Sequence, residues 1–335
     1  MKIYFVRDKH LQLKKLFYYL SNSLALLIPK FIFRILLSRE ISNVNNFNKS
    51  YIKKRLKYYI GLTNDFSISS EALTVNDLWA NQLIVFYENV VKKKVKKKRT
   101  TYFFDLYEYF RYFPAQVRLD YKFGDITSIF NTPTIVKSRP ILASKNSIIL
   151  NLNKIRHFHF VKDKNQFKDK INRAVWRGNS NNSKSRKYFI SNFQHVELFD
   201  IGQHGPKVDK PWYKGFMPIE QQLKYKFIFC IEGADTATNM KWVMNSNSVC
   251  VMPKPKYETW FMEGTLISDF HYIEVNDDFS NAEKKISYFL RNENKCLKII
   301  QNANLFVNQF KNQKREKLIS ILVLDKFFKK SNQNK

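Results

Sequence analysis

One stretch of the chain combines a buried-type strand with residues that suit the binding of an anion. Residues 227–231 are predicted to form a strand that ends at a Gly turn, with a helix opening shortly afterwards. Backbone N–H groups at such a helix start point at an anion beside the carboxyl edge of a sheet, and the ammonium group of Lys241 could neutralise a phosphate. An ordinary strand–helix connection, with Thr236 or Thr238 as the N-cap, would look the same. The candidate residues are Gly233, Thr236, Thr238, Asn239 and Lys241.

A second candidate lies in the sequence AVWRGN, where an apolar strand at residues 175–177 delivers Arg177 to a turn at Gly178. A guanidinium group at a strand end is well placed to give two parallel hydrogen bonds to a phosphate. An arginine held in a structural ion pair explains the same residues equally well.

A carboxylate suited to proton transfer occurs in the segment YKFGDITSIFNTPTIVKSRP. Asp125 follows a predicted strand and a glycine, so we expect it on an exposed loop where it could act as a general base. Lys137 and Arg139 are close enough in sequence to lie at the rim of the same cleft. The competing interpretation is that Asp125 is only a turn residue.

Glu258 and Glu263 follow another predicted strand end, at residues 249–252. A carboxylate in that position can accept hydrogen bonds from the hydroxyl groups of a ribose or another sugar. The alternative is a solvated acidic pair beside buried aromatic side chains.

From about residue 100 short strands alternate with helices, which predicts an α/β fold built around mainly parallel sheets. Helices are predicted at 183–192, 237–245, 281–291 and 294–310. The predicted strands are residues 121–123, 134–136, 148–150, 175–177, 196–201, 227–231, 249–252 and 272–275.

The chain of 335 residues carries 58 Lys and Arg against 28 Asp and Glu, a net charge of +30. Most of the excess lies at residues 1–57, 92–99 and 311–335, whereas residues 171–310 carry only +4. The positive charge therefore indicates a polyanionic partner, which could be nucleic acid, an anionic membrane surface or a phosphorylated substrate.

The N-terminal region has Leu and Phe at near-helical spacing from Leu13 to Ile35, with Lys and Arg between them and a break at Pro29. The pattern fits a basic amphipathic helix on an anionic membrane, or equally a helix packed on its own protein. Further helices are predicted at 47–60 and 75–91.

The sequence disfavours several classes of protein. Three widely spaced cysteines, without a CxxC pair, argue against a disulfide scaffold or a zinc ribbon and fit a reducing compartment. The chain contains no GxGxxG, Walker, Asp-X-Asp or HExxH motif. The 53 aromatic side chains offer stacking surfaces for nucleic acid, but they fall mostly within strand and helix patterns, where core packing explains them.

Taken together and in order, several motifs between residues 100 and 310 resemble glycosyltransferase family 90, the lipopolysaccharide and capsule-type transferases related to protein O-glucosyltransferases. The similarity is strongest to the bacterial branch, and residues 1–99 resemble no family. The motifs are FGD, PTIVKSRP, RHFHFVKDK, AVWRG, KYKFIFCIEG, ATNMKW, PKPKYETWF and HYIEV.

The resemblance implies a GT-B-type fold, in which two Rossmann-like domains face each other across a cleft, with an extra helical N-terminal region. It also implies an inverting, metal-independent transfer of a sugar from a UDP donor, with no cofactor. By motif order the catalytic base falls on Asp125 and the strand-end phosphate ligand on Arg177. Residues 236–241 would contact the nucleotide and Glu258 the ribose.

One residue departs from the family pattern. The helix after the EG turn carries an arginine in O-glucosyltransferases, where this chain has Asn239. Neutralisation of the diphosphate would then depend on Arg177, Lys241 and the helix N-terminus.

We therefore expect a glycosyltransferase that acts on a lipopolysaccharide or capsule glycan and lies peripherally at the inner face of a bacterial inner membrane. Expected parts are a basic helical region (1–99), the rest of an acceptor-side domain (100–170), a nucleotide-sugar domain (171–310) and a basic C-terminal helix or tail (311–335). The alternatives are a basic nucleic-acid-binding protein and a non-catalytic docking module of a glycan-assembly complex.

Overall fold

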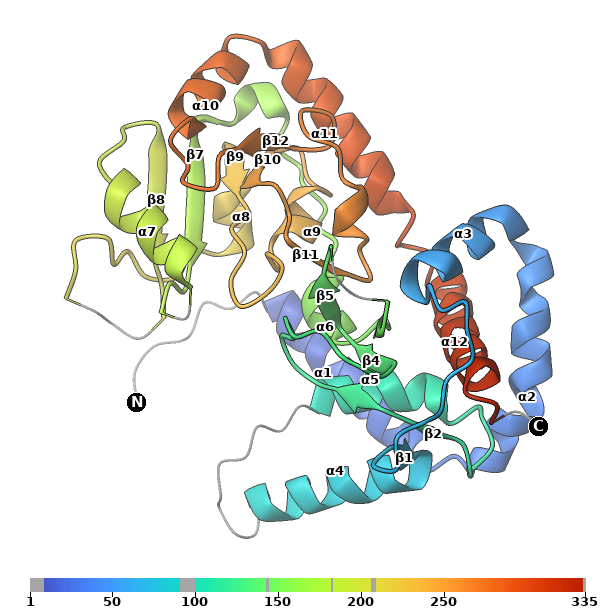
Figure 1. Cartoon of the computed structure of the whole chain (residues 1–335). Coiled ribbons are helices and arrows are strands. Elements are labelled where there is room, and N and C mark those ends of the chain that lie inside the picture. The colour runs from blue at the N-terminus through green and yellow to red at the C-terminus, as the bar shows by residue number, and fades with distance from the viewer. Residues whose placement is uncertain (1–8, 91–99, 143–144, 182, 206–208, 334–335) are drawn as a thin grey trace. The chain divides into compact units, whose positions relative to one another are not determined.

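The computed structural model describes residues 9–90, 100–142, 145–181, 183–205 and 209–333 (Figure 1). The basic run at residues 92–99 lies outside the described residues. The chain forms two compact units that interleave along the sequence. Unit 1 comprises Met1–Phe17, Arg156–Lys256 and Phe261–Gln309, and unit 2 comprises Tyr18–Ile155, Tyr257–Trp260 and Phe310–Lys335.

Unit 1 contains a five-stranded, fully parallel sheet in the order β12-β10-β9-β7-β8. The chain leaves β7 for β8 on one side and then returns to β9 on the other side of β7. The strand order therefore reverses between β7 and β9, as in doubly wound α/β folds. The strands are β7 (Ile171–Gly178), β8 (Phe199–Gln203), β9 (Tyr225–Phe229), β10 (Val249–Pro253) and β12 (Ile273–Val275).

The core of unit 1 is dominated by aromatic and β-branched side chains from these strands. Consecutive residues of β9, such as Phe227 and Ile228, are fully buried, which is typical of parallel strands covered on both faces. Phe189 of α7 lies 4.7 Å from Phe229 and 4.5 Å from Phe279, measured between ring centroids. Helices of unit 1 are α6 (Lys154–His157), which begins in unit 2, η2 (Phe167–Asp169), α7 (Lys184–Phe193), α8 (Ile219–Gln222), α9 (Met240–Val243), η3 (Glu263–Thr265), α10 (Ala282–Leu290) and α11 (Glu293–Asn308).

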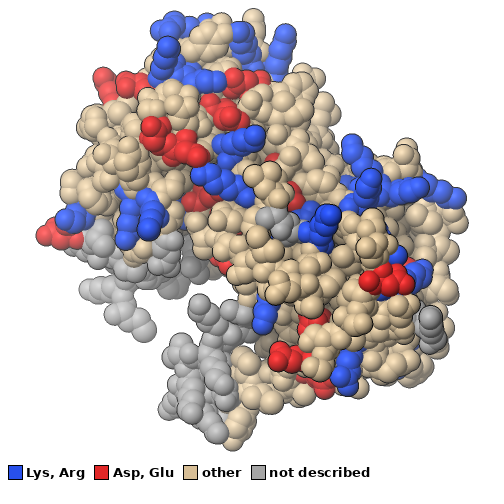
Figure 2. Space-filling model, viewed as in Figure 1, with Lys and Arg blue, Asp and Glu red and all other residues tan. Residues whose placement is uncertain are grey.

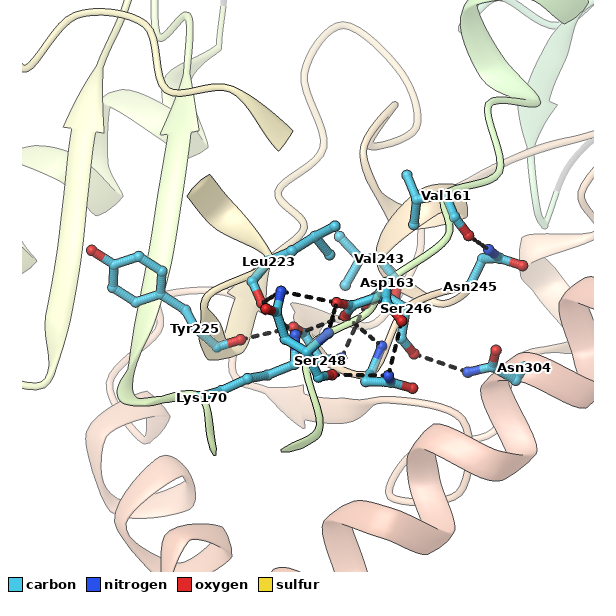
Figure 3. A network of polar contacts seen from close by, with 12 residues as sticks. Val161, Asp163, Lys170, Leu223, Tyr225, Val243, Asn245, Ser246, Ser248 and Asn304 are labelled. Atoms are coloured by element: carbon cyan, nitrogen blue, oxygen red, sulfur yellow. Dashed lines mark hydrogen bonds and ion pairs between the residues drawn. The ribbon is translucent and has the colours of Figure 1, made fainter. Parts of the chain in front are cut away.

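A polar network fixes the edge of this sheet at which its strands begin (Figure 3). The buried ammonium group of Lys170, just before β7, contacts Asp163 Oδ2 at 2.7 Å and the carbonyl oxygen of Leu223. The same carboxylate accepts a hydrogen bond from the backbone N–H of Asn247, just before β10. Because buried charges are costly unless paired and hydrogen-bonded, this network is structural and leaves the opposite edge for a ligand.

Unit 2 holds smaller sheets. Strands β3, β4 and β6 form a parallel sheet in the order β3-β4-β6, while β1 pairs with β2 and β5 with β11 in antiparallel fashion. The strands are β1 (Leu73–Thr74), β2 (Arg118–Leu119), β3 (Tyr121–Lys122), β4 (Thr134–Val136), β5 (Ser138–Pro140), β6 (Ser147–Ile149) and β11 (Tyr257–Thr259).

The basic C-terminal segment forms helix α12 (Gln313–Lys330), which lies in the core of unit 2. It packs against α2, α3 and α5, and its apolar side chains, such as Ile319 and Phe328, are fully buried. Its Glu316 is buried too, with an ion pair of 2.7 Å to Arg55 and a hydrogen bond of 2.7 Å from the indole of Trp260. Helix α12 is thus an internal element rather than a solvated tail.

Helices of the N-terminal region agree with the predicted pattern. The apolar segment divides at Pro29 into α1 and α2, and the predicted helices at 47–60 and 75–91 correspond to α3 and α4. Helix α5 follows, and eight of its eleven residues are buried. The bounds are α1 (Lys9–Ala25), α2 (Lys30–Ser42), η1 (Asn43–Asn46), α3 (Lys49–Tyr59), α4 (Val75–Val90) and α5 (Thr100–Phe110).

Charged side chains are dispersed on the face drawn in Figure 2. Lys and Arg stand singly or in small groups there, with Asp and Glu between several of them.

Candidate functional site

The switch point between β7 and β9 is where a ligand of a doubly wound sheet binds, at the carboxyl ends of the strands. Two loops meet there: residues 179–181 follow β7, and residues 230–233 follow β9. Both loops come from segments that the sequence predicted as strand ends. The predicted strand–turn–helix geometry is therefore present at this edge.

Arg186, in the first turn of α7, joins the two loops. Its guanidinium group donates to the carbonyl oxygen of Ile231 through Nε (3.1 Å) and Nη2 (2.7 Å), and through Nη1 to the carbonyl oxygen of Asn179 (3.2 Å). The helix that carries it starts at Ser183, whose hydroxyl accepts a hydrogen bond from the Arg186 backbone N–H. This cation therefore lies at the switch point.

Arg186 is not among the residues predicted from the sequence. The signal was present: Ser183 is an N-cap residue type three positions before an arginine, directly after the AVWRGN turn. The sequence does not show that this arginine reaches the loop after β9, because that depends on β7 and β9 being neighbouring strands.

Amide and hydroxyl groups continue the polar edge beside Arg186. Ser180 donates to Gln203 Oε1 at 2.6 Å, and Gln203 in turn donates to Asn181 Oδ1 at 3.0 Å. Burial, followed by the nearby guanidinium groups of Arg186 and Arg177, lowers the pKa of His204. The polar groups at this edge are thus a guanidinium group, a hydroxyl, side-chain amides and backbone N–H groups. Within the described ranges, no three His, Cys, Asp or Glu side chains gather in a way that could hold a metal ion.

Arg177 was predicted as a phosphate ligand, but the structure places it in an ion pair. Its Nη2 lies 2.7 Å from Asp200 Oδ1, and its Nη1 donates to the Asp200 carbonyl oxygen at 2.6 Å. Burial alone would raise the pKa of Asp200, yet hydrogen bonds from Tyr225, Arg177 and Lys214 outweigh it and hold that pKa well below its usual value. The competing interpretation, a structural ion pair, describes this residue.

Gly178, which ends β7, is required by the close approach of an indole ring. A Cβ at Gly178 would lie 2.3 Å from the Trp176 ring. The glycine therefore serves packing at the strand end, and it lets the chain turn into the 179–183 loop.

Lys241 was predicted to neutralise a phosphate, but it is fully buried. Its ammonium group pairs with Glu263 Oε1 at 2.6 Å and lies 3.4 Å from the hydroxyl of Thr236, which is itself buried. Both side chains of the ion pair are inaccessible to solvent. In this conformation the charge of Lys241 is already compensated by a neighbouring carboxylate.

The helix that carries Lys241 is also shorter than predicted. Helix α9 spans four residues, its N-cap is Asn239 rather than Thr236 or Thr238, and Thr238 lies half-buried before it. The side-chain amide of Asn239 donates to the carbonyl oxygen of Phe229 at 2.9 Å. So short a helix has little dipole to offer an anion. The predicted contribution of this helix start to anion binding is therefore small.

Asp125 lies in unit 2, on the loop after β3, as the sequence suggested. Gly124 before it has a φ of +124°, which a residue with a side chain rarely adopts. The Asp125 side chain is 30% exposed and forms an ion pair of 2.5 Å with Lys137, whose side chain is buried. The buried ammonium group of Lys137 thus orients the carboxylate, and the Asp125 side chain keeps part of its surface exposed to solvent.

Arg139 and Glu258, predicted for different roles, form one ion pair in unit 2. They are register partners in the β5–β11 pair, and Arg139 Nε lies 2.7 Å from Glu258 Oε1. Arg139 also donates to the carbonyl oxygens of Ser147 and Tyr58, and the Tyr58 hydroxyl donates to Glu258. Because both side chains are largely buried, this pair fixes the two strands; the structure does not bring Arg139 to Asp125.

Comparisons with known proteins agree with the resemblance noted from the motifs. The model of glycosyl transferase family 90 matches residues 149–317. A protein of Dichelobacter nodosus named O-glucosyltransferase LpsA is 36% identical over 282 residues, which is 84% of this chain and 83% of that protein. The uncharacterized protein 179R of Invertebrate iridescent virus 6 is 27% identical over 128 residues, 36% of this chain and 10% of that protein. This chain therefore belongs to glycosyl transferase family 90.

Proposed function

We propose that this glycosyltransferase moves a sugar, with glucose as the first candidate, from a UDP-sugar to a hydroxyl group of a lipopolysaccharide or capsule glycan. The single observation that carries the proposal is the similarity, over 84% of the chain, to a protein named as an O-glucosyltransferase. The proposed reaction inverts the anomeric centre, uses no metal and runs on a GT-B organisation, with the donor bound by unit 1 and the base supplied by unit 2.

The donor diphosphate is assigned to the β7–β9 switch point. A departing diphosphate gains negative charge as the glycosidic bond breaks, so the enzyme must place donors and cations where that charge develops. Arg186 and the backbone N–H groups of the residues that follow β7 (179–180) and β9 (231–232) are the groups assigned to this role. Hydrogen bonds to the carbonyl oxygens of Ile231 and Asn179 hold the guanidinium group at this edge, so that its positive charge lies beside the assigned diphosphate. Arg186 replaces Arg177 and Lys241 as the main cation of the proposal.

Asp125 is assigned the role of general base. Its carboxylate accepts the proton of the acceptor hydroxyl as that oxygen forms a bond to the anomeric carbon, while the bond from that carbon to the diphosphate oxygen breaks. Attack from the face opposite the leaving group inverts the centre. Lys137 holds the carboxylate in place through the 2.5 Å ion pair.

The test is turnover with a panel of UDP-sugars, followed as UDP release. The donor that supports turnover should also raise the melting temperature, because a ligand that binds only the folded state stabilises it. Asp125→Asn should keep this thermal shift and lose turnover by about 100-fold or more. Full activity in that variant would remove the base assignment, and undiminished activity in EDTA is expected. If none of the UDP-sugars binds, the donor class is wrong.

A further inference from the structure

Helices α1 and α2 carry large apolar side chains that point away from the protein. Leu27 is 79% and Ile35 71% exposed, whereas soluble proteins rarely leave so many such residues together at the surface. Positions 13, 16, 20 and 24 recur at helical spacing, so they share one side of α1, and Leu27 follows in the turn before α2. We call the following set the α1–α2 apolar face: Leu13, Leu16, Phe17, Tyr19, Leu20, Leu24, Leu27, Ile28, Phe31, Ile32 and Ile35.

From Tyr18 onward these helices belong to unit 2, and their opposite side is fixed within it. The Tyr18 hydroxyl donates to Asp105 Oδ1 at 2.8 Å. At the end of α1, Arg111 donates to the carbonyl oxygen of Ala25 at 3.2 Å. In α2, the buried Phe33 lies 5.3 Å from Tyr112 between ring centroids, and the Arg111 guanidinium stacks 3.8 Å over the Phe33 ring. The apolar face is therefore the outer side of an anchored pair of helices.

The charges on α1 and α2 are almost all positive, and the one acidic residue of α2, Glu40, pairs with Lys317 of α12. Residues 9–39 contain six Lys or Arg and no Asp or Glu. A second copy of this chain would bring these positive charges together, which is unfavourable. An anionic lipid surface offers the complement to both features, because its acyl chains take Leu and Phe while its phosphates take Lys and Arg.

None of the described helices is long and apolar enough to cross a bilayer by itself. Residues Gln12–Ala25 and Lys30–Asn46 meet the length and composition for a span only together, and they are bent by 106° at the break between them. Because contacts of Tyr18, Ala25 and Phe33 hold one side of these helices, the geometry favours helices that lie along a membrane surface.

We infer that the α1–α2 apolar face is a membrane-binding surface, inserted into the interfacial layer of an anionic bilayer. The exposed Lys14 would then lie at the level of the lipid phosphates. The inference stands on α1 and α2 alone, so it is independent of the proposed reaction. It would hold the enzyme peripherally at a membrane, and the inner face of a bacterial inner membrane is the location we propose.

The first test is flotation of the full-length protein with phosphatidylcholine vesicles that contain phosphatidylglycerol. Replacing Leu16, Leu20 and Leu24 with Glu should lower partitioning by about tenfold or more for each leucine removed from the acyl layer. The matched control replaces Leu297 and Leu305 of α11, which are 49% and 62% exposed, with Glu and should bind like the parent protein. Equal binding by parent and triple variant would overturn the inference.

The second test varies the charge of the lipid. Vesicles of phosphatidylcholine alone should bind the parent protein more weakly, and added salt should weaken binding to the anionic vesicles. If partitioning is the same on both vesicle types at every salt concentration, the anionic surface is the wrong partner. If the parent protein is a dimer without vesicles and the triple variant is a monomer, the face is a protein interface and the inference fails.

A third measurement does not depend on the Glu variants folding. All three native cysteines are buried, so Leu20→Cys can be labelled selectively with an environment-sensitive fluorophore. Its emission should shift to shorter wavelength on anionic vesicles, while the same label at Leu305→Cys stays unchanged. An unchanged label at position 20 would contradict insertion.

Discussion

Arg186 and Gly233 approach each other so closely that even a methyl group on Gly233 would make a tight contact with the guanidinium group. A Cβ on Gly233 would lie 3.0 Å from both Cζ and Nη2 of the Arg186 guanidinium group. The two residues come from loops that follow different strands, so the glycine sets where the cation of the proposed donor site can lie. The position of the guanidinium group therefore depends on the absence of a side chain at residue 233.

Gly233→Ala should therefore displace the guanidinium group and weaken UDP binding by about tenfold, the effect of losing one good charge-assisted hydrogen bond. Calorimetric titration with UDP measures the change. Gly61→Ala is the matched control, since a Cβ there would make only an ordinary contact of 3.6 Å. Unchanged UDP affinity in Gly233→Ala would place the diphosphate elsewhere.

The two arginines near the switch point should behave differently when each is replaced by methionine. Arg177→Met breaks the ion pair with Asp200 and should lower the free energy of unfolding by about 2–4 kcal/mol with little change in UDP affinity. Arg186→Met should instead raise the UDP dissociation constant about tenfold or more. Urea unfolding and calorimetry on both variants check this, and the reverse assignment of effects would restore Arg177 as the phosphate ligand.

The ion pair of Asp200 should also make stability depend on acid pH. The pKa of this carboxyl is depressed in the folded protein, so its stabilisation is complete above its unfolded pKa of about 3.9 and is lost as the pH falls further. Asp200→Asn should therefore be less stable than the parent at pH 7 and show a smaller loss on acidification. An identical acid dependence in both proteins would contradict this.

Lys137→Met tests whether the buried cation positions the proposed base. Without the ion pair the Asp125 carboxylate gains freedom, and a misplacement of about 1 Å can cost up to about 100-fold in turnover. We expect kcat to fall 10- to 100-fold with KM nearly unchanged, and a melting temperature close to that of the parent. The control is Lys122→Met, an exposed lysine in β3. A loss seen only in KM would argue for acceptor binding instead.

Asp105 gives a second pH dependence, of opposite sign. Burial raises its pKa to about 6, despite the favourable contacts from Lys154. The folded state thus binds the proton more tightly than the unfolded state, so this group adds stability as the pH falls from about 6 towards 4, by up to about 3 kcal/mol. The destabilisation that comes from burying the charged Asp105 carboxylate is fully present above pH 6.

Asp105→Asn mimics the protonated carboxyl and should remove this dependence. Compared with the parent, the variant should gain stability at pH 7 relative to pH 4.5, measured by urea unfolding at both. Asp169→Asn, a change at an exposed carboxylate, should leave the difference between the two pH values as it is in the parent. Parallel curves for Asp105→Asn and the parent would rule out the raised pKa.

The strand–helix alternation could be predicted from the sequence because each element carries its own local pattern. Apolar runs such as residues 227–231 and the break at Pro29 depend on neighbours a few positions away, and the structure confirms both to within two residues. The position of Asp125 on an exposed loop followed from a glycine beside it. These features need no knowledge of which strands pair.

The partners of the charged candidates could not be predicted, because they depend on register between distant segments. Arg177 meets Asp200 only because β7 and β8 are parallel neighbours, and Arg139 meets Glu258 across 119 positions of sequence. Lys241 finds Glu263 in the core by the same kind of distant pairing. Local sequence shows a cation at a strand end, but the fold decides whether its charge is already compensated.

The way in which the chain alternates between units 1 and 2 has a consequence for synthesis on the ribosome. Strand β11 and helix α12 both belong to unit 2, yet they are translated after most of unit 1. Unit 1 can therefore fold as soon as α11 has emerged, whereas unit 2 must wait with an open core until the last thirty or so residues arrive. A nonsense codon shortly after residue 309 would leave unit 1 complete and unit 2 without helix α12. The apolar surface that Ile319, Phe327 and Phe328 normally cover would then be exposed.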